Sequence, residues 1–287
     1  MQRQTLSQPT RTISGTGLFS AQPATVVIEP RKAATGIVFT LNGKTIPAHI
    51  DALSSRPVHP VFAQLKPRCT SIGDDDGTIA TIEHVLSALA GLGVTDAVVD
   101  VRCEARHAEI PIMDGSAKPF ADACLEVGLC ELSEPIDPIT VRERIEVRDG
   151  DASIVIEASD TPSYAYSIDY PGTPIGSHTA EWDGDRASYI DSVALARTFS
   201  LEHEANQMQR AGLFTHLSPR DMLVIGESGP IENEYRVEHE CAQHKLLDLI
   251  GDLALVGAPM LARVSAVRSG HALAHEAARA ILRQANA

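Results

Sequence analysis

Two residues in the C-terminal third of the chain, His244 and Asp248, have the types and spacing of metal ligands. They are four positions apart in a stretch with helical apolar spacing, so both side chains project from one helix face. An imidazole nitrogen and a carboxylate oxygen suit zinc, and a catalytic zinc site has three protein ligands and one open position. Leucines and Ile250 cover most other directions of this helix, where an unpaired carboxylate is costly to bury. The pattern therefore favours a ligand pair over a solvated helix face.

The adjacent residues Glu83 and His84 could complete such a site. They lie in the first turns of another expected helix, where His84 can be the third ligand and Glu83 a general base beside it. A site built from both helices would lie between the two halves of the chain. Taken by itself, however, a Glu-His pair is more often a capped or satisfied core histidine.

Histidines elsewhere offer two further patterns. His271 follows a small flexible turn on an expected loop after a strand, where an imidazole can donate a proton near neutral pH, although an ordinary exposed histidine fits equally well. A local zinc site of His239, Cys241 and His244 is disfavoured. Helix steps of two and three residues turn by about 200° and 300°, which directs these side chains apart.

Two helices must position these side chains, and the apolar periodicity predicts them over residues 80–92 and 238–256. The other expected elements are strands in 24–29, 36–41, 97–101, 139–169 and 262–267, and helices in 119–127 and 187–199. Pro135 and Pro138 disfavour continuous structure and indicate a domain boundary. Strands followed by helices in each half predict two α+β domains of similar layout, residues 1–134 and 139–287.

Composition narrows the class of protein. Hydrophobic residues make up 44% and charged residues 22%, which is typical of a folded globular chain. The net charge of −14 disfavours nucleic-acid binding, because an acidic surface repels phosphate backbones. We see no apolar run of the roughly 18–20 residues that a membrane span needs and no secretory signal, so we expect a cytoplasmic protein. The five scattered cysteines suggest neither a disulfide framework nor a thiolate metal cage.

Four separated blocks of sequence point to one family. They are TIEHVLSALAGLG (81–93), EIPIMDGSA (109–117), ARTF (196–199), and HKLLDLIGDL (244–253) followed by SGHAL (269–273). In order and spacing they resemble the zinc-dependent UDP-3-O-acyl-N-acetylglucosamine deacetylases, which catalyse the committed step of lipid A synthesis. The resemblance implies that His84, His244 and Asp248 bind Zn²⁺, that Glu83 is the general base, and that His271 protonates the leaving amine.

The same resemblance implies further roles. Thr198 would stabilise the oxyanion, and Asp252 would orient His271. Substrate contacts are implied for Lys245, Phe199, Arg142 and Arg268, with the two arginines near the diphosphate. The implied fold has two βααβ-type domains packed helix against helix, each with an insert, and the second insert, about 194–228, would form a passage for the acyl chain. The expected partner is the small-molecule acylated UDP-sugar, bound by a monomer.

Some positions depart from the family pattern. Phe19 stands where a histidine is usual, and Ser200 and Leu201 replace a glycine and an aromatic residue. These departures leave a zinc amidase for a different acylated amino sugar as an alternative. A metal-binding paralogue without turnover is a second alternative. Intact Glu83, Thr198 and His271 disfavour it, because a binding protein needs no acid, base and oxyanion donor together.

Overall fold

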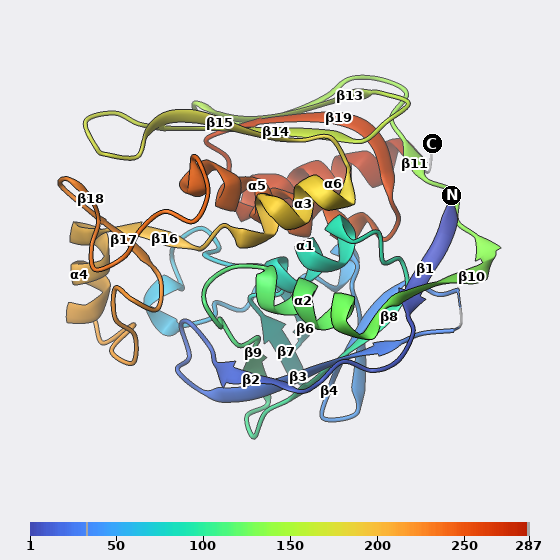
Figure 1. The fold of residues 1–287 in the computed structure, drawn as a ribbon, viewed down its shortest axis with the longest axis horizontal. Helices are drawn as coiled ribbons and strands as arrows, with labels where there is room; N and C mark the ends of the chain where they lie inside the picture. Colours follow the sequence, from blue (N-terminus) through green and yellow to red (C-terminus); the bar gives the residue numbers. More distant parts are fainter. Residues whose placement is uncertain (33, 286–287) are drawn as a thin grey trace.

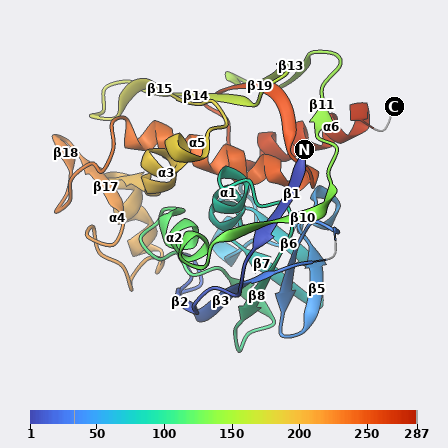
Figure 2. The ribbon, with the colours of Figure 1, turned by 45° about the vertical axis from the view of Figure 1, so that its right-hand side comes forward.

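Two outer sheets enclose a double layer of helices in the computed structural model, which describes residues 1–32 and 34–285 (Figures 1 and 2). The first sheet has the strand order β2 (Ile13–Thr16), β3 (Pro23–Pro30), β8 (Ala97–Arg102), β4 (Ile37–Leu41), β5 (Lys44–Pro47). The second has the order β12 (Ile145–Asp149), β13 (Ala152–Ala158), β19 (Met260–Val267), β14 (Ser163–Tyr170), β15 (Gly176–Trp182). The predicted α+β class is confirmed.

The two sheets share one topology. In each, the central strand is parallel to one neighbour and antiparallel to the other, and both flanking pairs are antiparallel. Alternate residues of the central and neighbouring strands are buried, for example Val26 and Ile28 in β3 and Val264 and Ala266 in β19. This period of two gives each sheet one apolar face, which the helices cover.

Helices follow the same order in both halves. In the first half, α1 (Glu83–Gly91) precedes the central strand and α2 (Lys118–Val127) follows it. In the second half, α5 (Glu240–Leu253) and α6 (His271–Ala285) take these places, and α3 (Arg186–Asp191) lies beside them (Figure 1). Two edge strands, β1 (Gln2–Leu6) and β10 (Leu129–Pro135), pair with each other, and β11 (Ile139–Thr140) joins β19.

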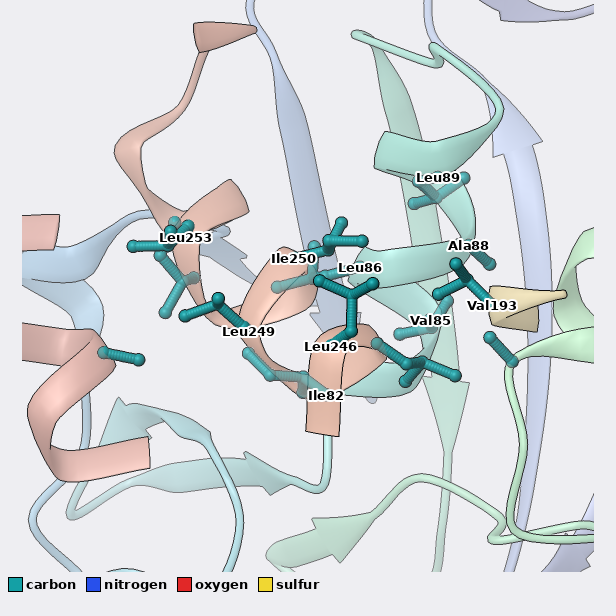
Figure 3. Packing of buried hydrophobic residues seen from close by; sticks show 14 of the residues in the cluster. Ile82, Val85, Leu86, Ala88, Leu89, Val193, Leu246, Leu249, Ile250 and Leu253 are labelled. Atoms are coloured by element: carbon teal, nitrogen blue, oxygen red, sulfur yellow. The ribbon is translucent and has the colours of Figure 1, made fainter. Parts of the chain in front are cut away.

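Helices α1 and α5 form the largest contact between the halves (Figure 3). Buried Ile82, Val85 and Leu86 on one side meet Leu246 and Ile250 on the other. One hydrophobic core therefore continues across this interface. The sheets of the described residues each draw strands from one half alone, but the division into folding units 1–134 and 139–287 remains a prediction.

Gly251 allows the two helix backbones to touch. A Cβ atom at this position would lie 2.0 Å from the carbonyl oxygen of Glu83 and 2.8 Å from its carbonyl carbon. Both atoms are backbone, so neither can rotate away. The close approach brings the residues at the start of α1 next to those in the middle of α5.

We expect Gly251→Ala to destabilise the protein by about 1–3 kcal/mol or more, because the added methyl must force the helices apart. Thermal or urea unfolding measures the loss. Gly270→Ala is the matched control, since a Cβ there meets no atom within 4 Å. Equal stability of the two variants would contradict the close helix contact.

Each half also carries an insert. The first holds a small sheet of β6 (Ser71–Asp74), β7 (Gly77–Ala80) and β9 (His107–Glu109). The second holds β16 (Phe199–Leu201), α4 (Glu202–Arg210), β17 (Leu223–Gly226) and β18 (Gly229–Pro230), at the left of Figure 1. That the second insert forms a passage for an acyl chain stays a prediction.

A second hydrophobic cluster joins the inserts to the loop after β2. It consists of Leu18, Phe19, Phe62, Cys69, Ala80, Ile112, Leu213 and Met222. The Phe19 ring lies 5.3 Å from the ring of Phe62 and 5.7 Å from that of Phe214. The aromatic residue that departs from the family pattern thus has a packing role, binding the second insert to the first half.

Some predicted boundaries were wrong. The helix expected over 187–199 ends at Asp191, where Ser192 leaves the helical conformation, and Phe199 is extended because it pairs with Leu223 of β17. The helix expected from residue 80 begins at Glu83, since Thr81 has a left-handed backbone (φ 58°). The chain is extended up to Pro135, which is the last residue of edge strand β10. Proline is tolerated there because an edge strand does not need every N–H for pairing. In the described part of the chain, no helix is long and apolar enough to cross a membrane.

Candidate active site

His84 from α1 meets His244 and Asp248 from α5 at the helix contact. The Nε2 atoms of His84 and His244 lie 3.6 Å and 3.5 Å from Asp248 Oδ1. One ligand atom from each residue lies within 4.8 Å of the others, and all three side chains are buried. In a tetrahedral zinc site with bonds near 2.0–2.1 Å, neighbouring ligand atoms are about 3.3 Å apart. The separations therefore fit zinc.

Hydrogen bonds outside the cluster orient these ligands. His244 Nδ1 lies 3.2 Å from the carbonyl oxygen of Ala196 and donates to it, which leaves the Nε2 lone pair free for a metal. Burial lowers the pKa of His244 to about 3, so the ring is neutral at pH 7. Lys245 Nζ donates to the second oxygen of Asp248. Burial raises the pKa of Asp248, but His244 and Lys245 outweigh it and hold that pKa well below its usual range.

Glu83 stands beside this cluster as the first residue of α1. Its Oε2 atom accepts a hydrogen bond from the backbone N–H of Thr70 at 3.0 Å. Burial raises the pKa of Glu83 to about 7, against the opposing charges of His271 and His84. A carboxylate that titrates near neutral pH can both accept and release a proton during turnover.

His271 forms a second charged pair with Asp252. Its Nδ1 atom donates to Asp252 Oδ2 at 2.8 Å. Burial lowers the pKa of His271, but the Asp252 charge and hydrogen bond outweigh burial and raise it to about 9. The expectation of a loop position was wrong, because His271 is the first residue of α6. The N–H groups of Leu273 and Ala274 bond to the carbonyl of Gly270, so the helix starts at this histidine.

The segment 196–199 is held against the site at each of its residues. Arg197 forms a buried ion pair with Glu240 at 2.7 Å, and the Thr198 N–H donates to the Gly115 carbonyl at 2.7 Å. The Phe199 ring lies 6.3 Å from the His244 ring. These contacts fix the backbone of half-buried Thr198 between Arg197, which pairs with α5, and Phe199, which lies near His244. Ser200 and Leu201 continue this segment as β16.

The structure separates the two arginines predicted to bind the diphosphate. Arg268 is exposed, three residues before His271, and lies 3.9 Å from Asp169. The backbone of Arg142 bonds to the side chain of Gln284, in the last turn of α6. With a helical rise of 1.5 Å per residue, Gln284 lies about 20 Å along α6 from His271. The backbone of Arg142 is therefore a full helix length from His271, and its contact with the diphosphate stays a prediction.

Two residues of this neighbourhood were missed from the sequence. Thr70 bonds to Asp252 through its hydroxyl, and His275 lies 2.8 Å from the same hydroxyl. His275 is four positions after His271, so the two share a helix face. That spacing was a usable signal, but the expected loop at His271 concealed it. No comparable local signal marks Thr70.

The fold and this site together define an α+β protein with a candidate metal centre at the interface of two packed helices. The family model "UDP-3-O-acyl N-acetylglycosamine deacetylase" matches residues 3–283, and the chain belongs to this family. The resemblance found in the four sequence blocks is thereby confirmed.

Curated relatives agree over nearly the full chain. A protein of Campylobacter fetus subsp. fetus is 31% identical, with 98% of this chain and 92% of the relative covered. One of Leptospira biflexa serovar Patoc is 33% identical, with 95% and 87% covered. One of Cellvibrio japonicus is 34% identical, with 100% and 92% covered. Each is named UDP-3-O-acyl-N-acetylglucosamine deacetylase.

Proposed function

We propose that this protein is a zinc-dependent hydrolase that removes the acetyl group from the amide nitrogen of UDP-3-O-acyl-N-acetylglucosamine, the committed step of lipid A biosynthesis. The observation that carries the proposal is the buried cluster of His84, His244 and Asp248, with a carboxylate base and an ion-paired histidine beside it. The names of the relatives support the substrate. A cytoplasmic location and a monomeric enzyme stay predictions from the sequence.

The three ligands would hold zinc at the helix contact. The chemistry that zinc supplies there is Lewis-acid activation of a water nucleophile and of the acetamide carbonyl. Glu83 accepts the proton of the attacking water, and its bond from the Thr70 N–H keeps the carboxylate aimed. Thr198 lies in segment 196–199, whose position is fixed by the Arg197–Glu240 ion pair and the bond to Gly115. From there its hydroxyl can donate to the developing oxyanion.

His271 supplies the proton that the leaving group needs. Cleavage of the C–N bond releases acetate and an amine, which is a poor leaving group unless its nitrogen is protonated. Asp252 accepts the Nδ1–H of His271, so the Nε2–H remains as the proton that His271 can donate to the leaving nitrogen. The raised pKa of His271 keeps the ring charged at neutral pH and ready to donate.

The rate should depend on pH with two limbs. Glu83 must be ionised, so activity falls as pH drops through its pKa, which is about 7 without metal and lower beside a divalent cation. His271 must be protonated, so activity falls as pH rises through its pKa, which is about 9 without metal and lower beside a divalent cation. The profile of kcat against pH measures both limbs. In His271→Ala the alkaline limb should be absent, and an unchanged limb would assign the acid to another group.

Binding of the diphosphate should depend on Arg268 and not on Arg142. Arg268 is exposed next to His271, whereas Arg142 lies at the far end of α6. We expect Arg268→Ala to raise the Kd of UDP about 3–10-fold at low salt and less at high salt, because salt screens exposed charges. Calorimetric titration with UDP measures this, with Arg142→Ala as the matched control. An unchanged Kd in Arg268→Ala would place the diphosphate elsewhere, and an equal loss in Arg142→Ala would include Arg142 in the binding site.

The deciding experiment is turnover by zinc-loaded protein. UDP-3-O-acyl-N-acetylglucosamine should give acetate and the free amine in equal amounts, and removal of zinc should stop the reaction. Other 3-O-acylated N-acetyl amino sugars should be tested in parallel. They test the alternative that the protein is an amidase for a different acylated amino sugar, which the departures at Phe19, Ser200 and Leu201 suggest. Faster release of acetate from one of these would assign the protein to that substrate.

A further inference from the structure

A buried chain of hydrogen bonds continues behind the proposed acid. His271 donates to Asp252 Oδ2, the Thr70 hydroxyl bonds to Asp252 Oδ1, and His275 Nε2 lies 2.8 Å from the Thr70 hydroxyl. The four side chains come from α5, from α6 and from the segment before β6. Thr70 and Asp252 are 0% and 1% exposed, so water does not compete for these bonds.

The donors and acceptors in this chain are determined by chemistry. Ionised Asp252 can only accept, so the single hydroxyl hydrogen of Thr70 must point to it. The Thr70 oxygen then accepts, and His275 must donate from Nε2. Burial lowers the pKa of His275 to about 4, which makes the ring neutral and able to carry one such N–H. Every polar atom in the chain thus has one consistent role.

Thr70 also contacts the other side of the reaction. Its backbone N–H donates to Glu83 Oε2 at 3.0 Å, and its carbonyl accepts from the N–H of Ile82, immediately before α1. One residue therefore bonds the proposed base through its main chain and the partner of the proposed acid through its side chain. A valine of the same shape could keep the main-chain bond to Glu83 but could not donate to Asp252.

We propose that Thr70 and His275 are positioning residues for catalysis, which share the negative charge of Asp252 and so set the strength of His271 as an acid. The role of His271 rests on the proposed function. A donated hydroxyl spreads the Asp252 charge, and a less basic carboxylate holds the imidazolium proton less tightly. The imidazolium of His271 can then release the proton on its Nε2 atom to the leaving amine, while the Nδ1–H stays bonded to Asp252.

The charges around both histidines bear on the size of this effect. Asp252 and Asp248 from α5 and Glu83 from α1 face His271. Asp252, His271 and Arg279 face His275. Removing the Thr70 hydroxyl leaves all of these charges in place, withdraws one donor from Asp252 and removes the acceptor of the His275 N–H. The buried anion then depends more on His271, so the pKa of His271 should rise.

The test compares Thr70→Val with Thr70→Ser in the zinc-loaded full chain. Valine keeps the shape and the N–H to Glu83 but has no hydroxyl, whereas serine keeps both. NMR titration of the ring signals of His271, assigned with His271→Asn, measures its pKa without any substrate. We expect the pKa to rise by about 1 in the valine variant and to stay at the parent value in the serine variant.

The kinetic counterpart is a shift of the alkaline limb of kcat to higher pH in Thr70→Val, with kcat reduced at most about tenfold, and KM and zinc content unchanged. His275→Leu should shift the pKa of His271 in the same direction but less, and His275→Gln, which keeps an N–H donor, should restore it. If Thr70→Val fails to fold, the pKa of His271 in these two His275 variants tests the proposal.

A His271 pKa that is unchanged or lowered in Thr70→Val and His275→Leu would overturn the proposed role. Because the NMR titration needs no turnover, it also separates the two hypotheses. A shifted pKa in a protein that releases no acetate would refute the proposed function and leave the hydrogen-bond network standing.

Discussion

Replacing Glu83 by glutamine is expected to reduce kcat by about 10²–10⁴-fold while zinc stays bound, because general-base catalysis contributes a factor of this size. Glutamine has nearly the same shape, and its carbonyl oxygen can still accept the Thr70 N–H. It cannot accept a proton from water. Steady-state kinetics and metal analysis of the same preparation measure the two outcomes together.

Stability supplies the control for Glu83→Gln. Burial raises the pKa of Glu83 from 4.5 to about 7 in the metal-free fold, so the ionised carboxylate disfavours folding as pH rises through this range. The neutral amide avoids that cost. Metal-free Glu83→Gln should therefore be at least as stable as the parent above pH 7, while it loses turnover. A variant within a few-fold of the parent kcat would remove Glu83 from the mechanism.

The second large effect is loss of the metal itself. One zinc per chain is expected in the parent, because two imidazoles and one carboxylate leave a single open tetrahedral position. His84→Ala removes the only ligand that α1 contributes, so zinc should dissociate on dialysis and activity should be lost with it. Asp248→Ala should act in the same way and also deprive buried Lys245 of its partner.

His239→Ala is the matched control for the ligand variants. His239 lies just before α5 and stacks on His178, with ring centres 3.9 Å apart, outside the cluster of His84, His244 and Asp248. It should retain zinc and activity. Metal analysis after dialysis, followed by readdition of zinc, measures the result. Full zinc retention in His84→Ala, or loss in His239→Ala, would assign the site to other ligands.

Local patterns in the sequence were sufficient for the parts of the site that lie within one element. His244 and Asp248 share a helix face because they are four residues apart, and this spacing is visible without any tertiary contact. Glu83 and His84 are adjacent, so their joint position at a helix start was also predictable. The helix over 187–199 was predicted too long, since the chain leaves the helical conformation at Ser192 and Phe199 pairs with β17, which overrides the local preference for helix.

Contacts between distant elements could not be predicted in this way. Thr70 and His275 are 205 positions apart, and no periodicity relates them. Arg142 was expected near the diphosphate by resemblance, and only the structure shows that its backbone bonds to Gln284, at the end of α6 opposite His271. Nothing in the neighbouring sequence explains a glycine at position 251 inside a helix. A glycine is needed there because any side chain would collide with the carbonyl of Glu83 on the facing helix.

The sequence by itself thus determined the α+β class, the family and the residue types of the proposed metal and acid–base groups, because each depends on neighbouring residues or on short blocks in order. Only the tertiary structure decided which of these groups meet. His84 reaches the α5 ligands because the apolar faces of α1 and α5 pack together and Gly251 lets their backbones touch. Burial at that contact, which excludes water, moves the pKa of Glu83 towards 7 and lets Asp252 raise that of His271.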